Sequence, residues 1–197
     1  MSASPDPLAK PALRRALRAE REALPAETVA SASAVVAARA VPILLEKRPA
    51  VVSAYLAMGR ELDPAPTAAA LRALGVTVAL PRVVARGEPL RFHAWQPGEP
   101  LETASLGVRQ PPAGAPEAVP DILLVPLLAF DPRGFRLGYG GGFYDRTLAQ
   151  LRATRPVLAI GIALERQLRP SLPVEPWDQP LDLVVTEAAV HRFVPAT

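Results

Sequence analysis

A glycine-rich turn at residues 136–145 carries the side chains best suited to chemistry. It reads Arg136-Leu137-Gly138-Tyr139-Gly140-Gly141-Gly142-Phe143-Tyr144-Asp145 and lies between an apolar segment and an amphipathic one. Glycines let a backbone approach a ligand closely, and the N–H groups that begin the next helix attract phosphate oxygens. Arg136 supplies a cation, and Asp145 supplies a carboxylate that can hold a magnesium ion bridging phosphates. The turn therefore has the parts of a nucleotide phosphate site.

The spacing of this turn leaves a second interpretation open. It is not a P-loop, because no Gly-Lys-Ser/Thr ends it, and it lacks the spacing of a dinucleotide fingerprint. A tight connection from strand to helix also uses glycines, and Asp145 then only complements the helix dipole. From spacing and composition alone, the two interpretations are equally good.

A row of cations lies on the first predicted helix, from Pro7 to about Leu24. Asp6 can cap this helix, and Pro7 suits its first turn. One stripe of the helix is apolar and the neighbouring stripe is basic. The apolar stripe is Leu13, Leu17 and Leu24, and the basic stripe is Lys10, Arg14, Arg18 and Arg21. A basic row beside a buried row can reach into an adjoining cleft, although a solvated face is the ordinary interpretation.

The remaining segments alternate between strand-like and helical patterns. We expect a helix at about 27–40 that kinks or ends at Pro42, and a helix from Asp63-Pro64 through Leu74, closed by Gly75. A fourth helix is expected at 143–151, and residues 96–120 are expected to form a long loop. The expected strands are 50–56, 76–80, 90–95, 122–130, 157–162 and 183–185, the last in the chain. This alternation predicts an α/β fold with a mostly parallel sheet, in one domain over residues 1–197.

The composition excludes several other kinds of site. The sequence contains no cysteine and only two distant histidines, which removes disulfides, thiolate nucleophiles and zinc thiolate sites. The net charge of +3 favours anionic ligands in general. No apolar run in the sequence approaches the roughly 20 residues that span a bilayer, and residues 1–10 lack the order of a signal peptide. We therefore expect a cytoplasmic protein without a membrane partner.

The order of residues along the chain resembles the 5-formyltetrahydrofolate cyclo-ligase family. The most specific part of the resemblance is Leu123-Leu124-Val125-Pro126, Ala129-Phe130-Asp131, Gly134 and the glycine turn. Weaker matches are Lys10-Pro11-Ala12-Leu13-Arg14, Tyr55-Leu56-Ala57-Met58 with Glu61, Trp95–Glu99, and Pro173, Glu175-Pro176, Asp178 and Pro180-Leu181-Asp182. The resemblance covers nearly the whole chain and implies a single three-layer α/β/α sandwich.

The resemblance also implies a reaction and a set of site residues. The reaction is the ATP- and Mg²⁺-dependent closure of 5-formyltetrahydrofolate to 5,10-methenyltetrahydrofolate, with release of ADP and phosphate. The implied catalytic residues are Lys10, Arg136 and Asp145, and the implied metal ligands are Asp145 and Asp182. The implied ATP-binding residues are Lys10, Arg14, Arg136, Leu137, Gly138, Tyr139, Gly140, Gly141, Gly142, Phe143 and Tyr144. The implied substrate-binding residues are Leu56, Glu61 and Tyr144, with Tyr55 nearby, and the partner is a reduced folate that can carry a polyglutamate tail.

Two positions depart from the family pattern. Trp177 stands where many relatives have histidine, and Gln110 stands where glutamate is common.

For the oligomeric state, a monomer is expected, with a dimer as the alternative.

Two rival functions are weighed against this one. The first is a nucleotide- or anion-binding module without catalysis. The second is nucleic-acid binding through the basic first helix, although the sequence shows no recognition motif and no interleaved aromatic residues, and no nucleic-acid partner is expected.

Overall fold

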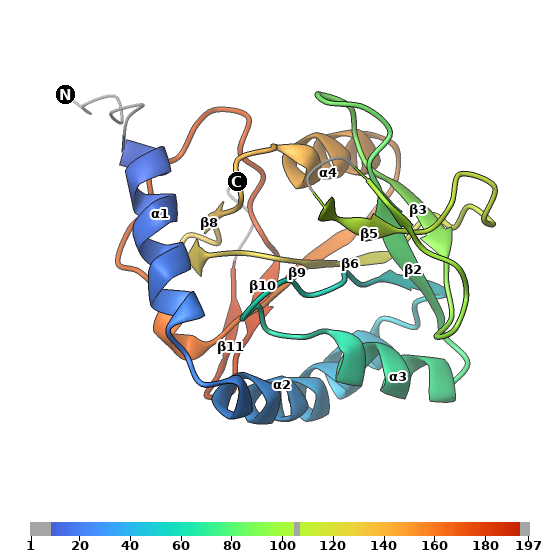
Figure 1. Ribbon diagram of the computed structural model, residues 1–197, viewed down its shortest axis with the longest axis horizontal. Helices are drawn as coiled ribbons and strands as arrows, with labels where there is room; N and C mark the ends of the chain where they lie inside the picture. Colours follow the sequence, from blue (N-terminus) through green and yellow to red (C-terminus); the bar gives the residue numbers. More distant parts are fainter. Residues whose placement is uncertain (1–8, 105–106, 194–197) are drawn as a thin grey trace.

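A seven-stranded sheet forms the middle layer of the protein (Figure 1). The computed structural model describes residues 9–104 and 107–193. The strand order across the sheet is β11-β10-β9-β6-β1-β2-β3. The bounds are β1 Val51–Ser53, β2 Thr77–Arg82, β3 Arg91–Ala94, β6 Ile122–Val125, β9 Leu158–Ile162, β10 Leu183–Val185 and β11 Val190–Arg192. Two small hairpins lie outside the sheet, β4 Glu102–Thr103 with β5 Arg109–Gln110, and β7 Ala129–Phe130 with β8 Arg136–Leu137.

The inner five strands run parallel, and the two edge strands are antiparallel to their neighbours. Parallel neighbours need a crossover, and two of the crossovers here contain an α-helix. Helix α3 (Ala65–Ala73) carries the chain from β1 to β2, and α4 (Phe143–Thr154) lies between β6 and β9. The predicted α/β class with a mostly parallel sheet is confirmed.

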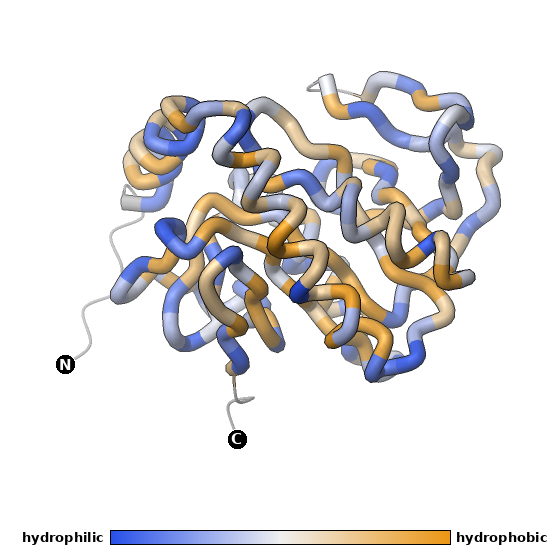
Figure 2. Tube along the Cα trace, turned by 90° about the horizontal axis from the view of Figure 1, so that it is seen from below, coloured by the Kyte–Doolittle hydropathy of each residue, from blue (hydrophilic) through white to orange (hydrophobic). Residues whose placement is uncertain are grey.

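Helices cover both faces of the sheet. Helices α2 (Ala26–Glu46) and α3 lie against one face, and α4 lies against the other (Figure 1). Successive side chains in a strand point to opposite faces, so Ile122 and Leu124 pack in the cluster that contains α2 and α3. Leu123 packs with Leu148 of α4. All of these are at most 1% exposed, and apolar stretches run through the middle of the chain trace (Figure 2). Truncating Leu124 to alanine would cost about 2–5 kcal/mol of stability.

Helix α1 (Ala9–Glu22) stands apart from these layers, at the end of the sheet near β7 and β8 (Figure 1). Its buried Leu17 packs on Leu128, Leu137 and Leu172, with Leu13 partly buried beside them. The predicted apolar stripe therefore anchors the helix, and the basic stripe lies beside that contact, with Lys10 and Arg21 buried. The predicted cap at Asp6 and Pro7 lies outside the described residues.

Several predicted boundaries change in the structure. Helix α2 does not end at Pro42 but continues to Glu46. Ala40 and Leu44, on either side of this proline, are both fully buried, and that packing offsets the hydrogen bond that proline cannot donate. The predicted strand 122–130 divides at Pro126 into β6 and β7 for the same chemical reason. The loop 96–120 contains the β4–β5 hairpin, and β11 follows the strand expected to be last.

The signals at helix α3 act as predicted. Asp63 Oδ1 accepts the N–H of Ala65 at 2.9 Å, at the start of the helix. Gly75 has φ of +82° and donates its N–H to the carbonyl of Arg72 at 3.0 Å, just past the end of the helix. A positive φ is available to glycine at little cost, which is why it ends the helix here.

The expectation that no apolar segment is long enough to span a bilayer is wrong for helix α2. With 21 residues it is long and apolar enough to cross a membrane by length and composition alone. Its residues Val36, Ala40 and Leu44 are fully buried in the core cluster shared with α3 and the sheet. A helix in a protein core can have the same length and apolar composition, and the packing of α2 shows that it is a core helix.

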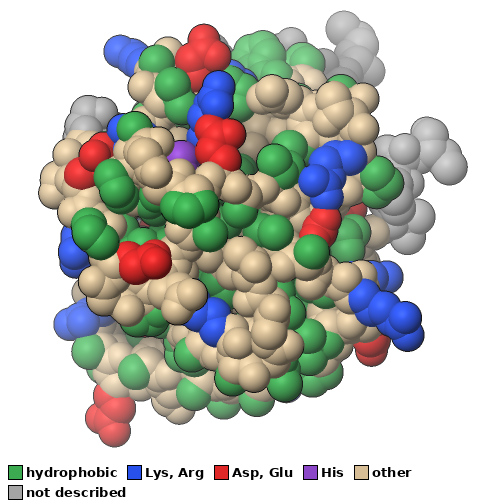
Figure 3. All heavy atoms as spheres, turned by 90° about the vertical axis from the view of Figure 1, so that its right-hand side faces the viewer, with side chains coloured by type: hydrophobic (Ala, Val, Ile, Leu, Met, Phe, Trp, Pro, Cys, Tyr) green, Lys and Arg blue, Asp and Glu red, His purple; other side chains and the backbone are tan. Residues whose placement is uncertain are grey.

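On the face beside β3 and β5, acidic and basic side chains are interspersed among apolar and uncharged ones (Figure 3).

Candidate active site at the carboxyl ends of the parallel strands

A cavity of about 990 Å³ opens where the central parallel strands end. Tyr55 follows β1, Pro81 lies near the end of β2, and Pro126 follows β6, and all three line it. The crossover after β1 runs over one face of the sheet, and the crossover after β6 runs over the other. In open α/β sheets, ligands bind at such a switch point, in the crevice outside the carboxyl ends of the strands. The topology therefore places the site before any side chain is considered.

The glycine turn forms one wall of this cavity and leads into α4. Gly140 and Gly142 have φ of +97° and +63°, which other residues adopt only with strain. Gly142 immediately precedes α4 and provides no side-chain cap for the first N–H groups of that helix. Because uncapped N–H groups and the helix dipole both favour negative charge, this wall suits phosphate oxygens.

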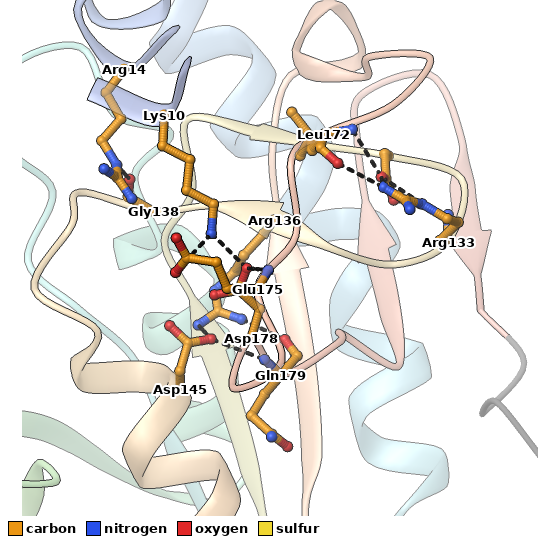
Figure 4. A network of polar contacts seen from close by, with 11 residues as sticks. Lys10, Arg14, Arg133, Arg136, Gly138, Asp145, Leu172, Glu175, Asp178 and Gln179 are labelled. Atoms are coloured by element: carbon orange, nitrogen blue, oxygen red, sulfur yellow. Dashed lines mark hydrogen bonds and ion pairs between the residues drawn. The ribbon is translucent and has the colours of Figure 1, made fainter. Parts of the chain in front are cut away.

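Arg136 and Asp145 form an ion pair beside the turn, as Figure 4 shows. Arg136 Nη2 lies 2.9 Å from Asp145 Oδ1, and Arg136 Nη1 donates to the carbonyl of Gln179 at 2.8 Å. The same Oδ1 of Asp145 accepts the N–H of Gln179 at 3.1 Å. The Arg136 side chain is only 5% exposed, so these partners fix its guanidinium in place. The segment around Gln179 is thereby tied to the start of α4.

Helix α1 brings its cations to the same wall (Figure 4). Lys10 Nζ lies 2.7 Å from Asp178 Oδ2 and 3.4 Å from Glu175 Oε2. Arg14 Nε donates to the carbonyl of Gly138 at 2.9 Å. Residues 124 or more positions apart in sequence thus meet at one point, and the structure unites Lys10 and Arg14 with the glycine turn.

Glu61 lies in the same cavity and is 6% exposed. Its Oε2 accepts the N–H of Met58 at 2.9 Å, and its Oε1 lies 3.4 Å from Arg21 Nη1. Leu56 lines the cavity beside it. This arrangement leaves a carboxylate held by the protein on one side and facing a ligand space on the other.

The three tyrosines of the chain gather around Glu61. Burial and the nearby Glu61 carboxylate raise the pKa of Tyr55, Tyr139 and Tyr144 above the usual value of a phenol. All three therefore stay protonated near neutral pH and can act as hydrogen-bond donors. Tyr55 donates to the carbonyl of Leu62 at 2.8 Å. The hydroxyl of Tyr144 is buried and has no hydrogen-bond partner among the described residues, although a buried hydroxyl normally has one.

The structure does not bring Asp182 to this cavity, which corrects the set of metal ligands implied by the family resemblance. Asp182 Oδ2 accepts from Arg152 Nη2 at 2.9 Å and from the N–H of Ala159 at 2.7 Å. Asp182 directly precedes β10, so it lies at the amino end of the parallel sheet, whereas the cavity lies at the carboxyl ends. Asp145 has no Asp182 beside it.

Besides Glu61, the acidic residues that line the cavity together with Asp145 are Glu175 and Asp178. Both belong to the C-terminal motif that resembles the family, but nothing in their spacing marked them as site residues. Within residues 9–104 and 107–193, no group of three or more His, Cys, Asp or Glu residues is arranged to hold a metal by itself. A magnesium ion commonly takes only one or two carboxylates and completes its shell with phosphates and water. The carboxylates here fit a magnesium site of this kind, in which phosphates and water supply the remaining ligands.

The two departures from the family pattern differ in position. Trp177 lines the cavity and is 65% exposed. Gln110 is buried away from the cavity lining, where its Oε1 accepts the N–H of Val83 at 3.0 Å and its Nε2 donates to Glu102 at 3.3 Å. The Gln110 substitution therefore concerns the β4–β5 hairpin, whereas Trp177 adds an aromatic ring to the site.

The fold and the site define an α/β protein with a cation-rich cavity at the switch point of its sheet. The sequence model of the 5-formyltetrahydrofolate cyclo-ligase family matches residues 7–187, and the chain belongs to this family. The 5-formyltetrahydrofolate cyclo-ligase of Escherichia coli (strain K12) is 39% identical over 150 residues, which cover 72% of this chain and 80% of that protein. The enzyme of the same name from Mycolicibacterium smegmatis is 38% identical over 148 residues, covering 68% and 72%.

Solved structures agree with this assignment. The 5,10-methenyltetrahydrofolate synthetase of Aquifex aeolicus has a TM-score of 0.79 at 27% identity and covers 95% of this chain and 94% of its own. The synthetase of Mycoplasma pneumoniae has a TM-score of 0.73 at 26% identity, covering 90% and 98%. Likeness over nearly the full length of both structures means that the family fold extends across the described chain.

Proposed function

We propose that this chain converts 5-formyltetrahydrofolate to 5,10-methenyltetrahydrofolate with the consumption of ATP in the presence of Mg²⁺. One observation carries the proposal beyond family membership. A single cavity holds the glycine turn with its cations at one wall and the Glu61 carboxylate with its tyrosines at another. Its volume of about 990 Å³ is at the upper end for small-molecule sites, which suits two ligands bound together.

The phosphates of ATP bind at the glycine turn in this proposal. Backbone N–H groups from Gly138 to Tyr144 approach the phosphate oxygens, and Lys10, Arg14 and Arg136 supply positive charge. Lys10 is now paired with Asp178 at 2.7 Å, so a bound phosphate competes with this carboxylate for the ammonium group. Leu137 is 1% exposed and packed against α1, so it contributes to the site through its backbone.

The metal site fits Asp145 together with Asp178 rather than Asp182. Asp145 Oδ1 is held by Arg136 and by the N–H of Gln179, which orients the carboxylate. Asp178 lies in the same wall, one residue before Gln179. When bound, Mg²⁺ would neutralise charge on the phosphates. Release of Asp178 from Lys10 would supply the second oxygen ligand.

The pterin ring binds at the Glu61 end of the cavity. A pterin presents adjacent N–H groups, and a carboxylate is a strong acceptor for them. Leu56 offers apolar contact beside Glu61. The buried and unpartnered hydroxyl of Tyr144 is a donor for a ligand oxygen between the pterin and phosphate ends.

The chemistry requires alignment more than acid–base catalysis. The formyl oxygen is a poor leaving group until it accepts the γ-phosphoryl group of ATP, which releases ADP. N10 then forms a bond to the formyl carbon and loses its proton, and the carbon–oxygen bond breaks as phosphate leaves. Holding the two ligands in line can supply about 7–11 kcal/mol of such a barrier. A site with cations, glycines and rigidly held tyrosines, and with no histidine in its lining, meets this demand.

The proposed ligands are ATP, Mg²⁺ and a reduced folate, which can carry a polyglutamate tail. The decisive experiment mixes the protein with Mg-ATP and 5-formyltetrahydrofolate and follows the absorbance of the methenyl product. Product must appear, and ATP consumption must depend on the folate and stop with a magnesium chelator. ATP turnover without folate, or nucleotide binding without turnover, would instead identify a noncatalytic binding module. Salt-sensitive RNA binding with no folate-dependent ATP consumption would favour the nucleic-acid rival.

A further inference from the structure

Arg21 is a buried cation near the end of α1, the helix that also carries three cations of the cavity lining. Lys10, Arg14 and Arg18 line the cavity, whereas Arg21 is 8% exposed and does not line it. Moving a charged group out of water is costly unless the protein supplies partners. The partners of Arg21 therefore indicate what it is for.

These partners come from three separate parts of the chain. Nη1 of Arg21 donates to the hydroxyl of Tyr139 in the glycine turn and lies 3.4 Å from Glu61 Oε1. Its Nη2 lies 2.8 Å from Oε1 of the neighbouring Glu22. The guanidinium carbon is also 5.6 Å from the centre of the Tyr139 ring, within reach of a cation–π contact. Arg21 thus connects helix α1, the glycine turn and Glu61.

Glu61 depends on Arg21 for one of its two oxygens. Oε2 is fixed by the N–H of Met58, and Oε1 faces the guanidinium. Without that cation the buried carboxylate would keep only one of these two partners, and it would be free to rotate. Tyr139 would at the same time lose the donor that holds its hydroxyl in the glycine turn.

We propose that Arg21 is a positioning residue for both halves of the site, holding Glu61 toward the folate and Tyr139 within the phosphate turn. This inference rests on the proposed function. Arg21 touches neither ligand and acts through the two side chains that do.

The test is a set of variants measured for KM of each substrate, kcat and thermal stability. Arg21→Met removes the charge while keeping much of the apolar stem, and Arg21→Lys keeps the charge with fewer donors. Arg15→Met is the matched control, because Arg15 is exposed on the same helix and outside the cavity lining. Glu61→Gln and the double variant with Arg21→Met complete a double-mutant cycle.

We expect Arg21→Met to raise KM for 5-formyltetrahydrofolate about tenfold or more, the usual scale for a lost charged hydrogen bond, with a smaller change in KM for ATP. Arg21→Lys should recover part of this loss, and Arg15→Met should match the wild type. The double variant should be little worse than Glu61→Gln alone, because both changes remove the same interaction.

Other outcomes overturn the inference. A purely structural Arg21 would give a lower melting temperature with unchanged KM for both substrates, or additive effects in the cycle. If Arg21→Met does not fold, Arg21→Lys decides, and a wild-type KM for folate in that variant contradicts the proposal. A wild-type protein that forms no methenyl product removes the proposed function and this inference with it. Normal wild-type turnover with unaltered KM in the variants removes only the inference.

Discussion

The glycine turn offers a paired test, because two of its glycines have different physical reasons to be glycine. Gly140 has φ of +97°, and a methyl group there would lie 3.4 Å from the guanidinium carbon of Arg14. Gly138 has no positive φ, and a methyl group there would meet no atom within 4 Å. Substituting each by alanine therefore separates backbone strain from occupation of the ligand space.

The expected stabilities differ in sign. Alanine at position 140 is forced into a disfavoured backbone region, at a cost of about 1–3 kcal/mol. Alanine at position 138 is unstrained and reduces the freedom of the unfolded chain, a gain of about 0.4–1 kcal/mol. Urea denaturation should therefore separate the two variants by about 1.4–4 kcal/mol, with Gly138→Ala at or above the wild type.

The activities should fall in both variants, for different reasons. Gly140→Ala strains the turn at its positive φ and redirects the neighbouring N–H groups, so KM for ATP should rise. Gly138→Ala keeps the fold but places a methyl group in open space at the cavity wall, where the phosphates must approach the backbone. Steady-state assays of methenyl formation with varied ATP measure both effects. Wild-type ATP kinetics in the stable Gly138→Ala variant would refute close approach of the phosphates at this point, and equal stability of the two variants would refute the strain argument.

Three further predictions follow from the same contacts. Asp145→Asn should abolish Mg²⁺-dependent turnover while the fold persists. Asp182→Asn should lower the melting temperature and leave the Mg²⁺ dependence of turnover unchanged. The reverse pattern would restore Asp182 to the metal site. Lys10→Ala should raise KM for ATP at least about tenfold, the scale of a lost charge-assisted hydrogen bond, with folate binding little changed, and an unaltered KM for ATP would discard its phosphate role. Because all three tyrosines have a raised pKa in the folded state, stability present below about pH 10 should be lost as the pH rises further, and tyrosinate absorbance should appear together with unfolding in an alkaline titration.

Much of the layered fold could be predicted, because it depends on local signals. The glycine at position 75 and the aspartate at position 63 define the two ends of α3 through their own backbone and side-chain bonds. Errors arose where burial outweighed a local signal. Pro42 should disturb a helix, but Ala40 and Leu44 are both fully buried against the sheet and the helix continues.

The candidate site could be predicted where its residues lie in one short motif. The glycine turn forms a continuous wall of the cavity, so its sequence already contains its geometry. The contact of α1 with this turn joins Arg14 to Gly138 across 124 positions, and the basic stripe only hinted at it. Arg21 belonged to the same stripe, but its burial depends on Glu61 and Tyr139, which no pattern within the helix reveals.

Strand direction explains why Asp178 belongs to the cavity wall and Asp182, four residues later, does not. An acidic residue directly before a parallel strand lies at the amino edge of the sheet. Asp121 precedes β6 and accepts the N–H groups of Ala50 and Val51, just as Asp182 precedes β10 and accepts the N–H of Ala159. These backbone contacts join the beginnings of neighbouring strands, and each aspartate also pairs with an arginine at the end of α4. A ligand at the carboxyl edge is a strand length away from these carboxylates. The predicted strand at 183–185 was therefore enough to remove Asp182 from the metal site, whereas Asp178 required the contact between Lys10 and the segment that precedes the strand.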